Sequence, residues 1–279
     1  MIALYIVCAC ILFLSLLVLI SEWRLLFLRK KRRKRTAVFV ARDYAHRGLH
    51  GNGVPENSLA AFRLAAENNY AIELDVQLTR DGIPVVFHDG TLTRVCGVPG
   101  GIADYTYAEL LTFRLLGSEE TIPAFSDVLS LIDGRVPLLI ELKNDGDGKK
   151  TTLAAAKLLK EYRGLYCVES FNPLLLRTFR REIPGAVCGV LSCNFSRQQA
   201  PRNLLYFLLR HLFFDFLATP DFIAYDFHDG HAFALRAARL FGAATFAWTI
   251  RNEEERKMAA GFGFDSLIFE NIRPKRENL

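Results

Sequence analysis

The chain has 279 residues, of which 51% are hydrophobic and 23% charged, and a formal net charge of +5. This apolar content excludes an intrinsically disordered chain, and only one stretch is apolar enough to cross a bilayer, which excludes a protein with several membrane spans. The charge is concentrated in residues 29–35, which are all basic; outside residues 1–36 the chain has 27 basic and 29 acidic residues. The body therefore does not carry the basic surface expected of a nucleic-acid-binding domain.

The first element in chain order is the apolar stretch Ile2–Ile20, which contains no charged residue. As a helix it would be roughly 28 Å long, close to the thickness of a bilayer core. No basic residue precedes it and no small-residue cleavage site follows it, unlike a signal peptide. We therefore expect a transmembrane helix at residues 1–22 and a basic juxtamembrane linker at residues 23–40. Because cations remain on the cytoplasmic side, the prediction is a single-pass protein of the cell membrane with a cytoplasmic body.

Short apolar runs alternate with helical patterns through residues 41–279, which form the body of the chain. The five residues Thr79–Ile83 are too few for a parallel crossover, so the runs on either side should form an antiparallel hairpin. The other eight runs predict a TIM-type (β/α)8 barrel, with an open doubly wound sheet as the alternative. The candidate strands are Tyr44–Gly48, Ile72–Leu78, Pro84–His88, Leu138–Lys143, Tyr166–Phe171, Val187–Ser192, Phe222–Phe227, Thr245–Ile250 and Ser266–Glu270. The candidate helices are Ser58–Asn69, Phe125–Asp133, Thr151–Tyr162, Asn172–Glu182, His231–Gly242 and Asn252–Ala260.

The segment Asn203–Leu217 has an almost entirely apolar helical pattern, with only a narrow polar stripe. An outer helix of a barrel should present a wider polar face to water. Two interpretations are open: a helix buried by a neighbouring loop or a dimer partner, or an interfacial helix that dips into the bilayer beside the barrel mouth.

Acidic residues recur where the apolar runs end, and in a barrel these ends meet at one mouth. Glu73 and Asp75 lie two residues apart and so share a face of their strand, as do Glu141 and Lys143. Three carboxylates in one pocket need a counter-charge, which a hard divalent cation with oxygen ligands, Mg²⁺ or Ca²⁺, supplies. The alternative is a set of strand-end salt bridges.

Two histidines, His46 and His88, also end apolar runs beside these carboxylates. A pair of imidazoles can supply a general base and a general acid near neutral pH. Arg47 and Lys143 can bind an anion, or simply compensate charge. Together with a cation, these groups indicate metal-assisted cleavage of a phosphate ester. The motifs of zinc proteases, serine hydrolases and nucleotide-binding loops are absent.

The order and spacing of these residues closely resemble the glycerophosphodiester phosphodiesterase family over residues 43–275. The resemblance implies a TIM barrel, a divalent cation, and hydrolysis of glycerophosphodiesters to an alcohol and glycerol 3-phosphate, with soluble diesters or lysophospholipids as substrates. The matching segments are Ala45–Gly48, Pro55–Ser58, Glu73–Val76, Thr79–Asp89, Ile140–Lys143, Ser170–Asn172 and Trp248–Thr249.

Carried over position by position, the resemblance assigns a role to each of these residues. It makes His46 and His88 the acid–base pair, Glu73, Asp75 and Glu141 the metal ligands, Arg47 and Lys143 phosphate contacts, and Trp248 a pocket wall. Asn57 resembles a support of the active-site loop, with a helix cap as the alternative. The family often has Thr-Asp after the last strand, where this chain has Glu270-Asn271, so a role for Glu270 stays open.

Three further questions also stay open. Either histidine can be the base, and either water or a hydroxyl of the substrate can attack, the latter through a cyclic phosphate. A lyase that ends at the cyclic phosphate is the nearest alternative activity. A catalytically inactive, membrane-bound lipid or phosphate sensor is the alternative from another class; loss of a histidine or carboxylate would favour it, but all are present.

Overall fold

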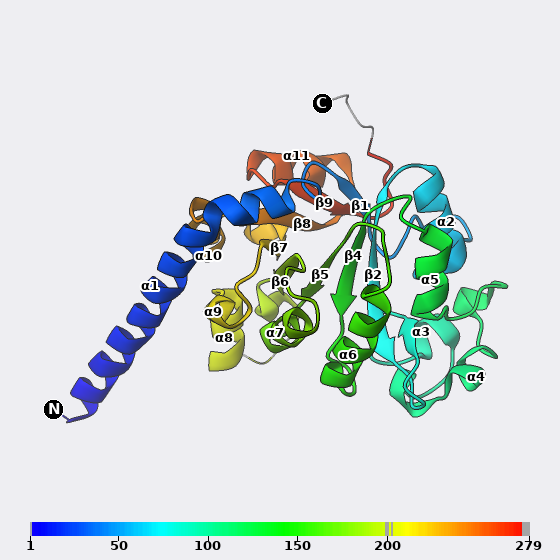
Figure 1. The fold of residues 1–279 in the computed structure, drawn as a ribbon, viewed down its shortest axis with the longest axis horizontal. Coiled ribbons are helices and arrows are strands. Elements are labelled where there is room, and N and C mark those ends of the chain that lie inside the picture. Colours follow the sequence, from blue (N-terminus) through cyan, green and yellow to red (C-terminus); the bar gives the residue numbers. More distant parts are fainter. Residues whose placement is uncertain (1, 199–200, 202, 275–279) are drawn as a thin grey trace.

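The apolar runs of the sequence form strands that are buried on both faces, as parallel strands covered by helices must be. The computed structural model describes residues 2–198, 201 and 203–274. Strand β1 (Asp43–Ala45) pairs in parallel with both β2 (Ala71–Leu78) and β9 (Ser266–Phe269), so the sheet closes on itself (Figure 1). The strands between them are β4 (Leu138–Leu142), β5 (Tyr166–Ser170), β6 (Cys188–Ser192), β7 (Phe222–Asp226) and β8 (Ala244–Ile250), all parallel.

The ninth strand, β3 (Pro84–Val86), is antiparallel to the last residues of β2. The eight-stranded TIM-type barrel and its additional hairpin are therefore confirmed, and the open doubly wound sheet is excluded.

Amphipathic helices cover the outer face of the barrel. The buried residues of α5 are Phe125, Val128, Leu129 and Ile132, which is the spacing of one helical face. Ser58 caps α2, because its hydroxyl accepts a hydrogen bond from the backbone N–H of Ala61. The helices are α1 (Ile2–Thr36), α2 (Leu59–Glu67), α3 (Thr93–Cys96), α4 (Tyr107–Leu110), α5 (Phe125–Ile132), α6 (Gly148–Leu159), α7 (Pro173–Glu182), α8 (Leu204–Arg210), α9 (Asp215–Ala218), α10 (Phe233–Leu240) and α11 (Glu253–Gly261).

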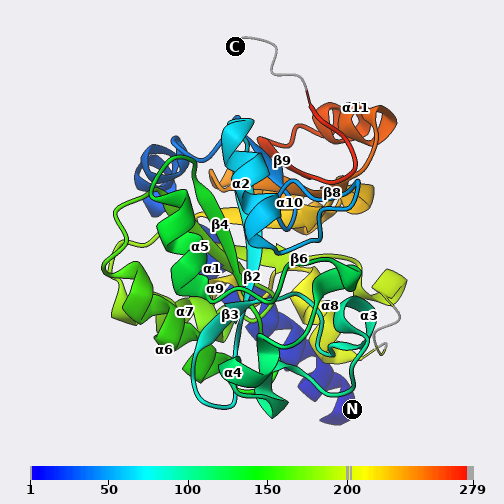
Figure 2. The same ribbon diagram turned by 90° about the vertical axis from the view of Figure 1, so that its right-hand side faces the viewer.

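The chain between β3 and α5 forms a small excursion that the sequence patterns did not predict. It contains α3 and α4, which lie beside β3 at one end of the barrel (Figure 2). Short 3-10 turns occur in this excursion and in two later loops, at Ile102–Asp104, Leu115–Gly117, Phe195–Gln198 and Phe227–Asp229. A separate apolar core holds the excursion together, built from Val85, Phe87, Leu92, Val95, Ile102, Leu110, Leu115 and Ile122.

The interior of the barrel is filled by side chains. The rings of Phe222 and Phe246 stack with their centroids 4.6 Å apart, and Tyr44 packs against Phe246 at 5.4 Å. Gly189 on β6 lies next to Phe222, and a β-carbon at this position would overlap the phenylalanine ring. The interior is therefore a packed core and not a channel.

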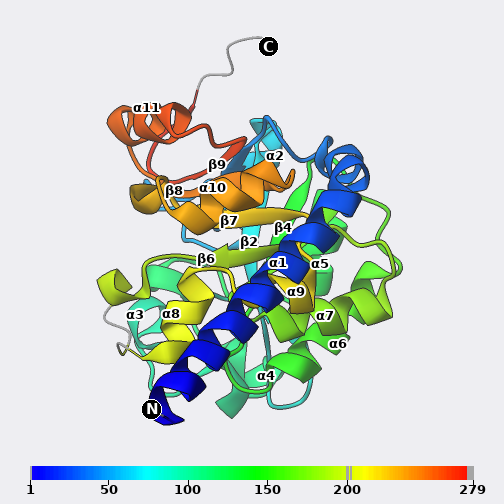
Figure 3. The same cartoon turned by 90° about the vertical axis from the view of Figure 1, so that its left-hand side faces the viewer.

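The prediction of a single-pass protein in the cell membrane is wrong. Among the helices that the structure describes, none is long and apolar enough to cross a membrane. The side chains of residues 1–11, in the first half of the predicted span, lie outside the described part. Residues 2–36, which hold most of the predicted span and of the predicted basic linker, are one continuous helix, α1, which crosses over α9 on the outside of the barrel (Figure 3).

The basic run at the end of α1 binds the barrel, although the sequence pattern predicted a juxtamembrane linker there. Arg32 is 2% exposed and donates hydrogen bonds to the carbonyl oxygens of Pro220 and Phe241. The guanidinium of Arg35 lies 3.1 Å from the carboxylate of Asp221. Pro220 and Asp221 lie just before β7, and Phe241 lies just after α10. The last turns of α1 are therefore attached to the barrel at the end where its strands begin.

The segment Asn203–Leu217 also differs from the predicted helix. It contains two short helices, α8 and α9, separated at Leu212, which has a left-handed backbone with φ of 58°. Leu204, Leu205 and Phe207 of α8 are exposed, whereas Leu212 is buried. The neighbouring loops of this chain therefore do not bury α8, and burial by a dimer partner stays a prediction.

We expect Gly189→Ala to destabilise the protein, because the new methyl group would overlap Phe222 in the barrel interior. Overpacking of this kind costs about 1–3 kcal/mol, which lowers the melting temperature by several degrees. Gly261→Ala is the matched control: this glycine ends α11, and a β-carbon there would have no neighbouring atom within 4 Å, so the melting temperature should stay unchanged or rise slightly. Equal melting temperatures of the two variants would contradict the packed interior.

Candidate active site

The inward-facing side chains of the barrel change from apolar to polar within two residues. Leu139 and Cys167 belong to the interior core, and the next inward positions on these strands are Glu141 and Glu169. Because side chains two residues apart share a face of a strand, the polar layer lies directly on the apolar core. The same step occurs from Tyr44 to His46, Ala71 to Glu73, Phe246 to Trp248 and Ile268 to Glu270.

Three carboxylates of this layer form one buried cluster. Glu73, Asp75 and Glu141 are 3%, 0% and 8% exposed, and one oxygen of each lies within 4.8 Å of the others. Burial, with the neighbouring carboxylates, raises the pKa of Glu73 well above its usual value, and burial raises the pKa of Glu141 to about 7. The cluster resists full ionisation in the absence of a counter-charge.

Two basic side chains and an amide compensate part of this charge. Lys143 Nζ lies 3.3 Å from Asp75 Oδ1 and 3.1 Å from Glu141 Oε1, and Arg47 Nε lies 3.8 Å from Asp75 Oδ2. Burial opposes the ionisation of Asp75, but Lys143 and its other basic neighbours outweigh it and hold the pKa of Asp75 below its usual value. Asn57 Nδ2 donates a 2.9 Å hydrogen bond to Asp75 Oδ2. Asn57 therefore supports this carboxylate, and the helix cap is the following serine.

A tight turn after β1 brings Arg47 to the cluster. Arg47 and Gly48 both have left-handed backbones, with φ of 54° and 80°. A β-carbon at Gly48 would lie 2.8 Å from that of Ala61 on α2, so only glycine allows this approach. The turn aims the backbone N–H of Arg47 at Glu73 Oε2, 2.8 Å away.

His46 is paired with a carboxylate from the other end of the chain. Its Nδ1 lies 3.2 Å from Oε2 of Glu270, which directly follows β9. Burial lowers the pKa of His46 to about 4, so the ring is neutral at pH 7. The hydrogen bond with His46 lowers the pKa of Glu270 to about 2. A neutral ring that donates from Nδ1 to a carboxylate has Nε2 free as a proton acceptor.

His88 has a corresponding pair in Asp89, with 2.8 Å between Nδ1 and Oδ1. Burial lowers the pKa of His88. Arg94 holds Asp89 through a 2.7 Å hydrogen bond and also binds Glu56, whose Oε1 accepts a 2.7 Å hydrogen bond from Arg47. A continuous chain of ion pairs thus connects the surroundings of the two histidines.

The predicted site residues converge on one cavity of about 330 Å³. Phe171 and Trp248 form an aromatic wall, with ring centroids 5.8 Å apart in an edge-to-face arrangement. Asp75 and Lys143 adjoin the cavity through their contacts with Glu141. The other six predicted residues line it: His46, Arg47, Glu73, His88, Glu141 and Trp248.

The donor set of the carboxylate cluster fits a hard divalent cation. It consists only of carboxylate oxygens, which Mg²⁺ and Ca²⁺ prefer. Asp75 Oδ1 is buried and lies 3.3 Å from Lys143 Nζ without a well-aligned hydrogen bond, so a lone pair of this oxygen is available to a metal.

The family model described as glycerophosphoryl diester phosphodiesterase family matches residues 46–273. The chain belongs to this family. It is therefore a phosphoric diester hydrolase that cleaves glycerophosphodiesters.

Individual members of the glycerophosphoryl diester phosphodiesterase family are similar to this chain over most of their own length. A glycerophosphodiester phosphodiesterase of Caldanaerobacter subterraneus subsp. tengcongensis is 32% identical over 240 residues, covering 80% of this chain and 91% of its own. One from Bacillus altitudinis is 43% identical over 173 residues, covering 57% of this chain and 69% of its own. The structure of an Oleispira antarctica phosphodiesterase in complex with the product sn-glycerol-3-phosphate matches with a TM-score of 0.70 and 26% identity, covering 84% of this chain and 94% of that one.

Three residues of this family member's site were not assigned a role from the sequence. Glu169 is 1% exposed beside the carboxylate cluster, its Oε2 makes no hydrogen bond, and burial raises its pKa well above the usual value. Asp89 and Glu270 are the carboxylate partners of the two histidines. Side chains two residues apart share a face of a strand, and Glu169 and Glu270 each lie two positions after an apolar residue of the barrel interior. This spacing could have identified both residues from the sequence.

We expect His46 to remain neutral down to about pH 5, because its burial opposes protonation. Histidine ring resonances followed by NMR should show it titrating near pH 4, and Glu270→Gln should lower its pKa further, since the carboxylate favours the charged ring. The unfolded chain binds this proton at higher pH than the folded chain does. The contribution of His46 to stability is therefore full above about pH 6.5 and falls as the pH drops towards 4. A His46 resonance that titrates near pH 6.5 would contradict the burial argument.

Proposed function

We propose that this chain cleaves glycerophosphodiesters at the barrel mouth by metal-assisted general acid–base catalysis, releasing an alcohol and glycerol 3-phosphate. The observation that carries the proposal is one cavity lined by two carboxylate-paired histidines beside three clustered, buried carboxylates. The product bound to the Oleispira antarctica relative, sn-glycerol-3-phosphate, supports this direction of cleavage.

Glu73, Asp75 and Glu141 would hold a Mg²⁺ or Ca²⁺ ion. When bound, such an ion withdraws charge from phosphate oxygens and so stabilises the charge that develops in the transition state. Arg47 lines the same cavity and offers a planar guanidinium to the phosphate oxygens. Lys143 remains between Asp75 and Glu141, where it limits their mutual repulsion.

The two histidines divide the proton transfers. Each engages a carboxylate through Nδ1, which leaves Nε2 of each ring for the substrate. The side chain of His46 is 14% exposed and that of His88 is 32% exposed. Because the more exposed ring is more readily protonated, we assign His88 as the acid that protonates the leaving oxygen. His46 then accepts the proton of the attacking oxygen.

A lysophospholipid is the second candidate substrate, supported by a row of aromatic rings. From Trp248 and Phe171 the row continues to Phe195, 6.0 Å from Phe171, and to Tyr206 of α8, 5.2 Å further. Phe195 and Tyr206 line a neighbouring cavity of about 270 Å³. The row offers apolar surface to an acyl chain beyond the catalytic cavity.

We expect hydrolysis of glycerophosphocholine to stop when divalent cations are removed by a chelator and to return when Mg²⁺ or Ca²⁺ is restored. Glu141→Gln should not be rescued in this way, because the variant loses a ligand. Product analysis on glycerophosphocholine and on lysophosphatidylcholine decides between the two substrates and detects any cyclic phosphate. Full activity of the chelator-treated enzyme would remove the cation from the proposal.

We expect His46→Ala and His88→Ala each to lower kcat on glycerophosphocholine by at least about 10²-fold, the usual scale of general acid–base catalysis. A diester with a p-nitrophenolate leaving group needs little help from an acid. On this substrate His88→Ala should recover most of the loss, whereas His46→Ala should not. Recovery of His46→Ala alone would reverse the assigned roles, and near-normal turnover of either variant on glycerophosphocholine would exclude that residue.

A further inference from the structure

A second group of metal-binding side chains lies beside the catalytic cavity. His46 follows β1, His50 lies four residues later, and Glu270 follows β9. One ligand atom of each lies within 4.8 Å of the others. Within residues 2–198, 201 and 203–274, this group and the carboxylate cluster are the two that could hold an ion.

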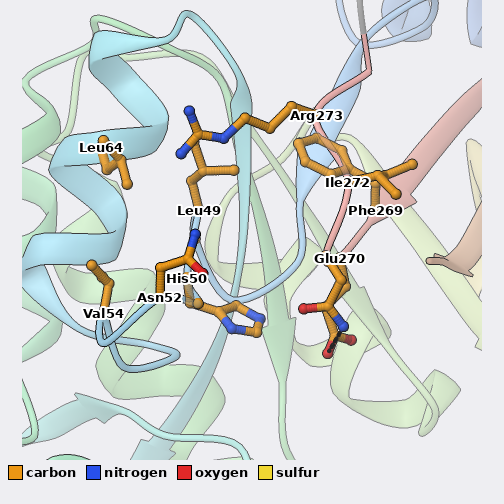
Figure 4. A pocket seen from close by; sticks show the side chains of 12 residues that line it. Leu49, His50, Asn52, Val54, Leu64, Phe269, Glu270, Ile272 and Arg273 are labelled. Carbon is orange, nitrogen blue, oxygen red and sulfur yellow. Dashed lines mark hydrogen bonds between the residues drawn. The ribbon is translucent and has the colours of Figure 1, made fainter. Parts of the chain in front are cut away.

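Two members of the group, His50 and Glu270, line a second cavity of about 410 Å³, whereas His46 lines the catalytic cavity. Leu49, His50 and Asn52 line one side of it, and Phe269, Glu270 and Arg273 line the other. Figure 4 shows the imidazole of His50 extending across the cavity towards Glu270. An ion can therefore reach His50 and Glu270 without passing through the catalytic cavity.

His50 is held in place by its backbone, yet one nitrogen of its ring has no hydrogen-bond partner among the described residues. Its backbone is fixed by the hydrogen bond from its N–H to the carbonyl of Gly48 and by the adjacent bridge between Gly51 and Val54. Nε2 of His50 is buried and makes no hydrogen bond. Buried polar atoms normally have a partner, so this nitrogen is suited to a ligand.

The chemistry of the donors differs from that of the carboxylate cluster. Two imidazoles and one carboxylate are the donor set of many Zn²⁺ sites, whereas three carboxylates suit Mg²⁺ or Ca²⁺. We propose that His46, His50 and Glu270 form an inhibitory zinc site next to the active site.

Zinc at this site would stop the proton transfer at His46. In the resting protein, Nδ1 of His46 carries the proton that faces Glu270. Zn²⁺ takes the lone pair of Nδ1, and the proton moves to Nε2, so the ring stays neutral. Nε2 then carries a proton and can no longer accept one from the attacking oxygen. Inhibition rests on the proposed function of His46; zinc binding does not.

Neighbouring cations set the strength of the site. Arg251 lies 3.2 Å from Oε2 of Glu270, but half of its side chain is exposed and can turn towards solvent. The other oxygen, Oε1, accepts a long 3.5 Å hydrogen bond from Asn271. Arg47 and Arg94 also act on His50 electrostatically and oppose a cation. The site should therefore bind zinc reversibly, as a regulator, and more weakly than a structural zinc site.

The experiment titrates the full-length protein with ZnCl₂ at saturating Mg²⁺. Calorimetry measures binding, and cleavage of glycerophosphocholine measures inhibition. His50→Gln should keep its zinc-free activity within about twofold and weaken both zinc binding and inhibition at least about tenfold, the scale for loss of a metal-site partner. His231→Gln, at an exposed histidine outside the group, is the matched control and should match the parent.

The outcomes separate the zinc site from the proposed function. If His50→Gln binds zinc and is inhibited as strongly as the parent, zinc acts elsewhere and the site is wrong. If the parent shows no zinc binding, the site is equally wrong. If no variant cleaves glycerophosphocholine but calorimetry still finds His50-dependent binding, the site stands and the proposed function fails. Should the glutamine variant not fold, as judged by circular dichroism, His50→Ala replaces it in the same assays.

Discussion

The mutual repulsion of three buried carboxylates governs the arrangement of the barrel mouth. Glu73, Asp75 and Glu141 are nearly inaccessible to solvent, and each disfavours the ionisation of the others. Lys143 lies between Asp75 and Glu141, and the guanidinium of Arg47 also approaches Asp75, so only part of the charge is compensated. A hard divalent cation would supply the positive charge that the cluster still lacks. Replacing one of these basic residues by a neutral one would therefore disturb the whole cluster.

Carboxylates have a different function around the histidines, where they orient rings. His46 and His88 each direct Nδ1 towards a carboxylate, and burial lowers the pKa of both rings. The chain of ion pairs from Asp89 through Arg94 and Glu56 to Arg47 connects the carboxylate partner of His88 to the guanidinium of Arg47. The ring of His88 and the guanidinium of Arg47 are thus positioned by one connected network.

The opposite end of the barrel is built from apolar packing and from the attachment of α1. Its interior is closed by stacked aromatic rings, and Phe39 adds to this core just after α1. The last turns of α1 are attached there by Arg32 and Arg35, which bind backbone carbonyls and the carboxylate of Asp221. The division between a stable end and a reactive end is the usual one in a TIM barrel.

The sequence alone determined the features that depend on local pattern. Apolar runs marked the strands, the five residues after β2 required a hairpin, and pairs such as Glu73 and Asp75 had to share a strand face. These follow from the period of a strand and from the length of a turn, which neighbouring residues decide.

Only the tertiary structure decided which distant groups meet. The contact between His46 and Glu270 joins residues 224 positions apart, and it exists because β1 and β9 pair when the barrel closes. The same closure brings His50 to Glu270 and makes a second group of side chains that could hold a metal, which no spacing in the sequence reveals. The basic run of α1 was misinterpreted for the same reason: the sequence shows its charge, but only the fold shows that Asp221 and the carbonyl of Pro220 neutralise and bind it.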